Sequence, residues 1–258
     1  MEVFSLKEVI FEKRDGAAWV TMNRPEALNS LTAELCAGLV ETLAECERDA
    51  CVRAVVLTGA GRAFCAGGDL KTLAALKSRE EAEAYVRTAG AVALAVIRSA
   101  KPYVAMVNGA AAGAGFNLAL ACDFVCASKK AKFTQAFSTI GLISDCGGNF
   151  LLPRLVGPAM AKRLMMLPET LSADEAAALG LVSAVADDAE LAEKTAALAA
   201  RLAKQPPRAL AEIKKFQNDA ELFEAALHRE EKIQAELICG GECKEGVAAF
   251  LEKREPKF

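Results

Sequence analysis

One local pattern occurs twice in this chain of 258 residues: a short apolar strand, a glycine-rich turn and the start of a helix. The first copy spans residues 54–70 and the second spans residues 103–118. The alanines within the two turns, Ala66 and Ala114, lie 48 residues apart, and a third apolar strand follows at residues 124–127. Strands that alternate with helices favour a buried parallel sheet with right-handed connections. The sequence therefore predicts an α/β protein built as a spiral of repeated β-β-α turns.

The residues before this array predict a hairpin and a helix. Two β-prone runs, at residues 9–11 and 18–22, flank Asp15-Gly16, a dipeptide that tolerates the positive φ angles of a tight turn. Thr32 is a suitable N-cap for the amphipathic helix that follows, because leucines recur there every three or four residues. The chain is thus expected to open with an antiparallel pair of strands.

Beyond Pro153 the sequence is almost purely helical in character. A capping box at residues 172–175 predicts a helix start, and the prolines at residues 206–207 predict a break before three further helices. We therefore predict two parts: a core over residues 1–200 and a helical C-terminal region over residues 201–258.

Composition argues against several classes of partner. A net charge of −3 gives no general attraction for nucleic acid. The nine cysteines include no C-x-x-C pair, which favours reduced thiols over a disulfide framework or a metal site. The first residues lack the features of a secretion signal, and the uncharged run at residues 103–122 is interrupted by Asn108, Asn117 and glycines. We expect a cytoplasmic protein that binds no metal, nucleic acid or membrane.

The two glycine-rich turns are candidate binding elements. Such turns leave backbone N–H groups pointing into open space, and the first helical turn at residues 113–116 adds the positive end of a helix dipole. Two turns that face one point could therefore hold an oxygen that carries negative charge. Spacing alone leaves open that the glycines only allow close packing. Dinucleotide binding fits less well, because Leu118 stands where the third glycine of that motif is required.

Asp145 is a carboxylate inside residues 133–148, a segment that is otherwise uncharged and largely apolar. Its neighbours Leu142 and Ile143 would raise the pKa of the carboxyl and make it a useful base. Alternatively, Asp145 simply caps the helix that begins near Gly147. The local sequence leaves both interpretations open. The single histidine, at position 228, lies in a charged helical stretch and is expected at the surface.

Several segments resemble the enoyl-CoA hydratase/isomerase (crotonase) superfamily. They are residues 23–29 (NRPEALN), 55–70 (VVLTGAGRAFCAGGDL), 101–109 (KPYVAMVNG), 112–115 (AGAG) and 250–254 (FLEKR). The resemblance runs nearly end to end. It implies a crotonase-like ββα spiral with a C-terminal helical trimerisation region, and a homotrimer or a hexamer made of two trimers. It also implies an acyl-CoA thioester as substrate, no further cofactor, and association with other β-oxidation or phenylacetate-pathway enzymes.

The same resemblance implies a set of site residues. Ala66 and Ala114 match the two backbone N–H donors that hold the thioester oxygen in that family, and one such donor is typically worth about 2.7–4 kcal/mol. Phe250 and Lys253 match C-terminal positions that contact coenzyme A. The other residues expected at the substrate lie on the matched segments: Arg24, Asp69, Leu70, Gly113, Asn117 and Phe137.

Three departures from the family pattern bear on the chemistry. Family hydratases carry two glutamates, and at the matching positions this chain has Asn117 and Phe137, neither of which can act as a base at neutral pH. Asp145 is then the only carboxylate in the matched active-site segments, and an Asp here resembles the bases of the family's double-bond isomerases. Ser144 stands where such relatives usually have proline, which predicts a looser backbone beside Asp145.

These observations predict an acyl-CoA isomerase. Asp145 would remove a proton and return it elsewhere, while the N–H groups of Ala66 and Ala114 hold the enolate oxygen. Residues 131–154 and 245–254 look most like the ring-1,2-epoxyphenylacetyl-CoA isomerase branch of the superfamily. The alternatives are a Δ3,Δ2-enoyl-CoA isomerase, an enoyl-CoA hydratase, a dehalogenase and a non-catalytic acyl-CoA-binding subunit. The sequence leaves the acyl group open.

Overall fold

A computed structural model describes residues 3–6 and 8–258 of the chain, and side chains from residue 8 onward. Its larger sheet has seven strands in the described residues, mixed in direction. In spatial order they are β1 (Val3–Leu6), β2 (Val9–Arg14), β3 (Ala17–Met22), β4 (Ala54–Gly59), β6 (Tyr103–Val107), β8 (Phe124–Ser128) and β11 (Ala184–Ala186). The predicted hairpin is confirmed, because β2 pairs antiparallel with β3 across Asp15-Gly16.

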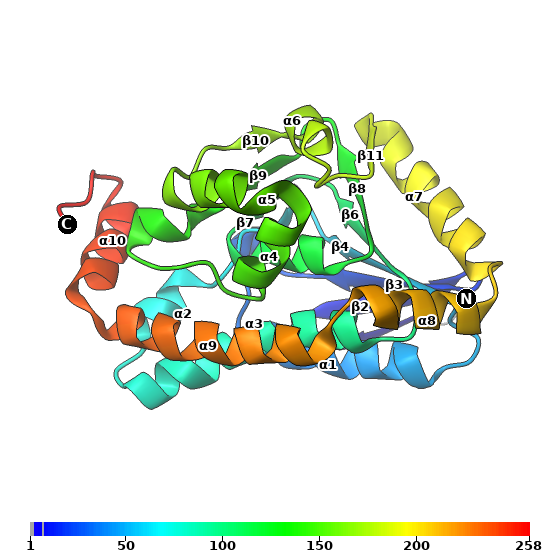
Figure 1. Ribbon diagram of the computed structural model, residues 1–258, viewed down its shortest axis with the longest axis horizontal. Coiled ribbons are helices and arrows are strands. Elements are labelled where there is room, and N and C mark those ends of the chain that lie inside the picture. Colours follow the sequence, from blue (N-terminus) through cyan, green and yellow to red (C-terminus); the bar gives the residue numbers. More distant parts are fainter. Residues whose placement is uncertain (1–2, 7) are drawn as a thin grey trace.

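A smaller sheet of four strands lies beside the first (Figure 1). Its order is β10 (Leu171–Ser172), β9 (Lys132–Thr134), β7 (Ala110–Ala112) and β5 (Ala63–Cys65). Each of its parallel strands follows a strand of the larger sheet along the chain: β5 follows β4, β7 follows β6, and β9 follows β8. The pairing is parallel among β4, β6 and β8, and also among β5, β7 and β9. Successive turns of the chain thus give one strand to each sheet, which confirms the predicted β-β-α spiral.

Helices complete each turn of the spiral and continue to the C-terminus. They are α1 (Ala33–Arg48), α2 (Leu70–Ala75), α3 (Arg79–Arg98), α4 (Ala114–Ala121), α5 (Gly148–Met166), α6 (Ala173–Ala178), α7 (Asp188–Ala203), α8 (Pro207–Gln217), α9 (Ala220–Cys239) and α10 (Gly241–Glu252). Two 3-10 helices, η1 (Pro25–Ala27) and η2 (Ala136–Ile140), precede α1 and α5. Within the described residues no helix is both long and apolar enough to cross a membrane.

Different helices cover the two faces of the larger sheet. Because neighbouring residues of a strand point to opposite faces, Val20 packs into the main core with α1 and α3, whereas Trp19 packs against α7. Thr32 caps α1 by accepting a hydrogen bond from the Leu35 N–H at 3.2 Å, as predicted. The capping box at Ser172 is also confirmed.

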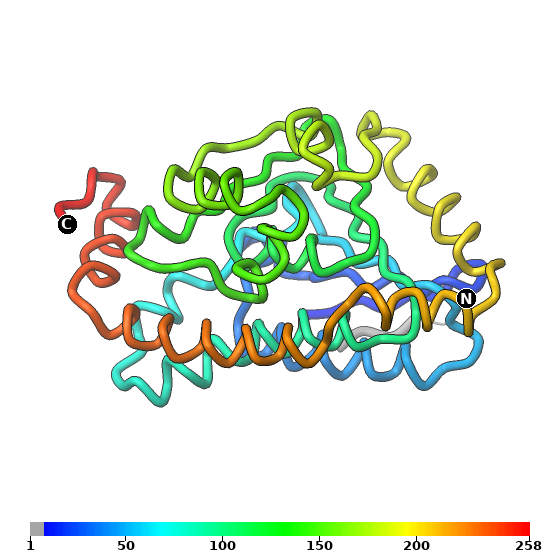
Figure 2. Tube along the Cα trace, viewed as in Figure 1, coloured from blue at the N-terminus to red at the C-terminus, as the bar shows by residue number. Residues whose placement is uncertain are grey.

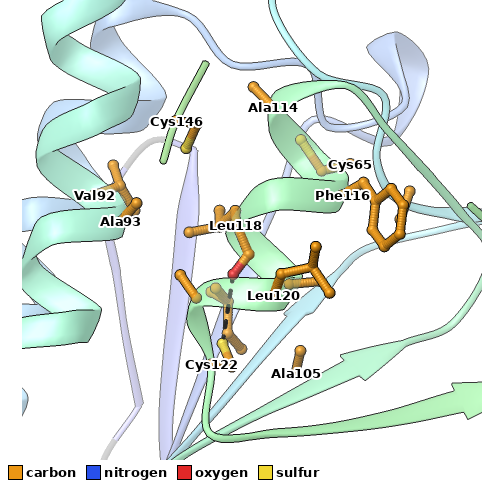
Figure 3. Packing of buried hydrophobic residues seen from close by; sticks show 14 of the residues in the cluster. Cys65, Val92, Ala93, Ala105, Ala114, Phe116, Leu118, Leu120, Cys122 and Cys146 are labelled. Atoms are coloured by element: carbon orange, nitrogen blue, oxygen red, sulfur yellow. Dashed lines mark hydrogen bonds between the residues drawn. The ribbon is translucent and has the colours of Figure 1, made fainter. Parts of the chain in front are cut away.

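Helix α4 lies inside the main core and is buried on all sides (Figure 3). It approaches the strand β5 so closely that a Cβ at Gly115 would collide with the Cys65 carbonyl oxygen. Close packing is therefore the role of this glycine, one of the two explanations that the sequence left open. The contact brings the N-terminus of α4 against the glycine-rich turn that follows β5.

The C-terminal helices fold back onto the core instead of standing apart from it. α9 runs along α3, and α10 packs on η2 at the end of the molecule that holds the C-terminus (Figure 2). A Cβ at Gly246 would overlap the backbone of Ile140, so glycine allows α10 to sit there. The division at residue 200 stays a prediction, although α9 and α10 touch segments from the middle of the chain.

Beyond Pro153 the chain is almost purely helical, as predicted, and three helices follow Pro206. Two short strands, β10 and β11, lie in that part and extend the two sheets. β11 has only three residues and pairs in parallel with β8. Strands this short are defined by the neighbour that they pair with and leave almost no periodic signal in the sequence.

Candidate active site

A cavity of about 320 Å³ lies where the two glycine-rich turns meet α3, η2, the Asp145 segment and α10. Its wall is mostly apolar, and Asp145 is the only carboxylate among the described residues that line it. The structure brings together here many of the residues predicted from the sequence: Ala66, Leu70, Gly113, Ala114, Phe137, Asp145 and Phe250. Phe250 stays 61% exposed, which places it at the mouth of the cavity.

The carboxylate of Asp145 is asymmetric in its contacts. Its Oδ2 accepts a hydrogen bond from Gln234 Nε2 at 2.9 Å, whereas its Oδ1 is buried and has no partner in the described residues. Burial raises the pKa of Asp145 to about 6, and the hydrogen bond from Gln234 opposes part of that shift. The raised pKa expected from the apolar neighbours is therefore found.

The alternative role for Asp145, as a helix cap, is wrong. The N-cap of α5 is Gly147, and the side chain of Asp145 donates nothing to and accepts nothing from the first turn of that helix. The carboxylate of Glu230 accepts from the N–H groups there instead, at 2.8 Å from Gly147 and 3.0 Å from Asn149. Asp145 is thus free to act on a molecule in the cavity.

Of the two N–H donors predicted in the glycine-rich turns, one is unpaired and the other is already hydrogen-bonded. Ala114 is the first residue of α4, and its N–H has no acceptor in the described structure. The N–H of Ala66, in contrast, donates to the Leu28 carbonyl at 3.0 Å, so the structure does not support Ala66 as the second donor. Leu28 ends η1 with a left-handed φ of 51°. Its carbonyl accepts from Ala66, the residue that follows β5.

Gly68 provides the available donor in the first turn. Its N–H has no acceptor in the described residues, and Gly68 lines the cavity together with Ala114. The two turns are close, since a Cβ at Gly67 would lie 3.4 Å from the Ala114 nitrogen. The unpaired N–H of this turn therefore lies two residues beyond the predicted Ala66.

Asn117 is not at the cavity, contrary to its predicted contact with substrate. It is fully buried, and its Nδ2 donates to the Ser144 Oγ at 2.9 Å and to the Asp145 carbonyl at 2.7 Å. Gln135 Nε2 donates to Asn117 Oδ1 at 2.7 Å, and Ser144 Oγ donates to Gln135 Oε1 at 3.1 Å. Proline has no hydroxyl and could make neither of the two bonds of Ser144 Oγ. Hydrogen bonds thus tie the segment that Ser144 was expected to loosen.

Three other predicted residues lie outside the cavity wall. Arg24 forms ion pairs with Glu8 at 3.3 Å and Asp69 at 3.6 Å, and Asp69 caps α2 by accepting from the Thr72 N–H. Lys253 follows α10 in a left-handed conformation, with φ of 55°. These groups hold the turns around the cavity or lie near its exposed end. Contact with coenzyme A stays a prediction for them.

Metal and redox sites are not apparent in the described residues. No group of three or more His, Cys, Asp or Glu side chains there could hold a metal ion, and every cysteine is free. His228 is exposed and lies 3.7 Å from Glu231 on the same helix, as expected for a surface residue.

Comparison with known proteins identifies the family. The family model for enoyl-CoA hydratase/isomerase matches residues 12–258. The chain is 42% identical over 248 residues to 1,2-epoxyphenylacetyl-CoA isomerase of Escherichia coli (strain K12), covering 94% of this chain and 95% of that protein. It is 41% identical to a probable enoyl-CoA hydratase of Rhodobacter capsulatus, covering 98% of each.

Solved structures agree with this result. A crystal structure of an enoyl-CoA hydratase from Mycobacterium avium subsp. paratuberculosis K-10 superposes with a TM-score of 0.89 at 36% identity, covering 98% of this chain and 99% of that one. The chain therefore belongs to the enoyl-CoA hydratase/isomerase family and has the crotonase fold. Its relatives include proteins named as isomerases and proteins named as hydratases.

Proposed function

We propose that this protein is an acyl-CoA isomerase that uses Asp145 as its single base, with a coenzyme A thioester as substrate and no further cofactor. The observation that carries the proposal is the state of Asp145: it is the one carboxylate in the described wall of the cavity, and its pKa is raised to about 6. A base with a pKa near the working pH combines ionisation with a useful affinity for a proton.

The reaction needs one proton transfer in each direction. Asp145 takes the proton from the carbon next to the thioester carbonyl, and the electron pair of that C–H bond moves toward the thioester oxygen. The N–H groups of Gly68 and Ala114 then donate to the enolate oxygen, where charge develops. Asp145 then gives a proton to another carbon of the acyl chain, and the double bond shifts.

Hydration is the alternative that the site supports less well. Adding water requires groups that activate it, and the positions of the two family glutamates hold Asn117, which faces Ser144, and Phe137, which lines the cavity. Neither side chain can take a proton from water. A single base suffices for isomerisation, because no water is added.

The acyl group is less constrained than the chemistry. The apolar wall suits a hydrocarbon or aromatic acyl group, and the similarity to a 1,2-epoxyphenylacetyl-CoA isomerase favours a ring epoxide. A Δ3,Δ2-enoyl-CoA would use the same base and donors. Both belong to the proposal, and the assay below distinguishes them.

We also propose that the protein assembles as a trimer, or as two trimers, in the cytoplasm, where other β-oxidation or phenylacetate-pathway enzymes are candidate partners. The assembly is supported by large apolar side chains left exposed in the C-terminal part, among them Ile213, Phe216 and Leu222. Phe216 is 88% exposed in the single chain, and such a side chain gains most by packing against another subunit.

The test is a side-by-side assay of one preparation on a 3-enoyl-CoA, on crotonyl-CoA and on the ring epoxide ester, following the conjugated thioester for the first two and loss of the epoxide for the third. We expect conjugation to form without hydration, and Asp145→Asn to lose at least about 100-fold in kcat while still binding the ester. Asp187→Asn, an exposed change of the same type, is the control.

The other outcomes distinguish the alternative functions. Near-normal turnover by Asp145→Asn would refute the assigned base. Hydration that does not depend on Asp145 would make the protein a hydratase with a different base. Activity confined to the ring epoxide would select that substrate, and ester binding without any turnover would indicate a binding subunit.

A further inference from the structure

Helix α9 presents two buried polar side chains to the segment that carries Asp145. Glu230 is 3% exposed and Gln234 is 1% exposed, and they lie one helical turn apart. Polar groups buried to this degree are costly unless they are hydrogen-bonded, and both direct their bonds to residues 143–149. Ile238, one turn further along, lines the cavity, so this face of α9 follows the candidate active site.

Gln234 binds the segment through both ends of its amide. Its Oε1 accepts from the Ile143 N–H at 3.1 Å, and its Nε2 donates to the Ile143 carbonyl at 2.9 Å. Because these two bonds fix which end of the amide is the donor, the group that faces Asp145 Oδ2 is the Nε2, also at 2.9 Å. The amide therefore holds one carboxylate oxygen of Asp145 and leaves the other without a partner.

Glu230 fixes the backbone on the other side of Asp145. Cys146 and Gly147 adopt positive φ angles of 53° and 83°, a conformation that directs the N–H groups of this turn to one acceptor. Glu230 accepts from the Gly147 N–H at 2.8 Å, and from the N–H and Nδ2 of Asn149 at 3.0 and 3.1 Å. The Asp145 segment is thus held by α9 both before and after the carboxylate.

We propose that Gln234 is a positioning residue for the base: by holding Oδ2 of Asp145, it directs Oδ1 at the reacting carbon, while Glu230 fixes the backbone that follows. This inference rests on the proposed function, since the orientation of Asp145 matters to turnover only if Asp145 moves the proton. A base that is free to rotate spends less time in the reactive geometry, and a misplacement of about 1 Å can cost about 100-fold in rate.

The ionisable groups that face Asp145 come from three places. They are Glu230 on α9, Tyr85 on α3 and the adjacent thiol of Cys146. Burial raises the pKa of Tyr85 and of Cys146, so both stay neutral at physiological pH. Burial raises the pKa of Glu230 to about 7, which leaves this carboxyl as the second group that titrates near the site.

The test is Gln234→Met, which keeps the length of the side chain and removes both the donor and the acceptor of the amide. We expect kcat to fall about 10- to 100-fold with KM within about twofold of wild type. The acid limb of kcat/KM should move to higher pH, because a hydrogen bond that favours ionised Asp145 is gone. Glu236→Met, on the exposed side of the same helix, should behave as wild type.

A second variant covers the case in which Gln234→Met fails to fold. Gln234→Glu keeps the shape and the acceptor for the Ile143 N–H, but places a like charge beside Asp145. The acid limb should then move up by about one pH unit or more. A fall in kcat with an unmoved acid limb in the folded variants would mean a purely structural role and would overturn the inference, as would wild-type kinetics.

The failure of this inference is distinguishable from the failure of the proposed function. If Asp145→Asn is inactive while the Gln234 variants match wild type in kcat and pH profile, Asp145 is the base and Gln234 does not position it. If Asp145→Asn keeps full turnover, the assigned base itself is wrong.

Discussion

At the scale of single residues, the proposed chemistry depends on the environment of Asp145. The sequence predicted a base with a raised pKa from its apolar neighbours, and the structure places that carboxylate in an apolar wall with one hydrogen bond. The partner, Gln234, could not be predicted, because it lies 89 residues away in the sequence on a helix of ordinary polar character. Only the fold brings the two together.

A buried base reduces stability, and this effect is measurable. The pKa of Asp145 is raised from 3.8 to about 6, so the folded chain resists ionisation of this group. Below about pH 4 the carboxyl is protonated in both the folded and the unfolded chain, and it costs no stability. The free energy of unfolding then falls as the pH rises through about 6, because the unfolded chain ionises more readily. At pH 8, Asp145→Asn should therefore be more stable than wild type, by up to about 3 kcal/mol.

The measurement is denaturant-induced unfolding of both proteins at one protein concentration, at pH 8 and near pH 4.5. The gain should shrink at the lower pH. A variant that is less stable than wild type at pH 8, or a difference that does not depend on pH, would contradict the raised pKa.

The donors of the glycine-rich turns show where residue-level prediction ends. Ala114 was predicted from family resemblance, with support from the helix dipole of residues 113–116, and its N–H is without an acceptor in the described residues. Ala66 was predicted from family resemblance alone. The η1 turn supplies the Leu28 carbonyl to that N–H, and a sequence pattern does not contain this long-range bond. The donor two residues on, Gly68, follows only from the hydrogen-bond partners.

At the scale of elements, the strands and turns near the site were predictable because each has a strong local cause. β4 and β6 are short apolar runs followed by glycine, and α1 begins at a side-chain cap. The β-β-α order then fixes where both turns meet. α9 was expected only as a helix, whereas its buried face of Glu230, Gln234 and Ile238 depends on packing against segments that are distant in the sequence.

The substitutions at Ser144 and Asn117 also belong to the scale of elements. Considered separately, Ser144 predicted a looser loop, and Asn117 predicted the absence of a family base. In the fold they are partners, since the Asn117 amide donates to the Ser144 hydroxyl, and Gln135 joins them. The network links α4 to the backbone of the Asp145 segment.

At the scale of the whole molecule, the exposed apolar face of the C-terminal helices predicts assembly. Phe216→Glu should shift the protein toward the monomer in sedimentation at micromolar concentration, because a charge at a subunit contact opposes burial. Lys215→Glu, a neighbouring exposed position on α8, serves as the control for surface charge.

An unchanged oligomer in Phe216→Glu would exclude this face from the interface. A monomeric wild-type protein would contradict the proposed assembly altogether. Because Phe250 and α10 lie at the mouth of the cavity, a monomeric variant also reports whether substrate binding needs a neighbouring subunit.

The most direct test of the central claim is proton exchange at the carbon next to the thioester, measured in heavy water with a saturated acyl-CoA that cannot isomerise. We expect wild type to incorporate deuterium, and Asp145→Asn to do so at least about 100-fold more slowly with its ester affinity retained. Equal exchange by both proteins would contradict the assignment of Asp145 as the base.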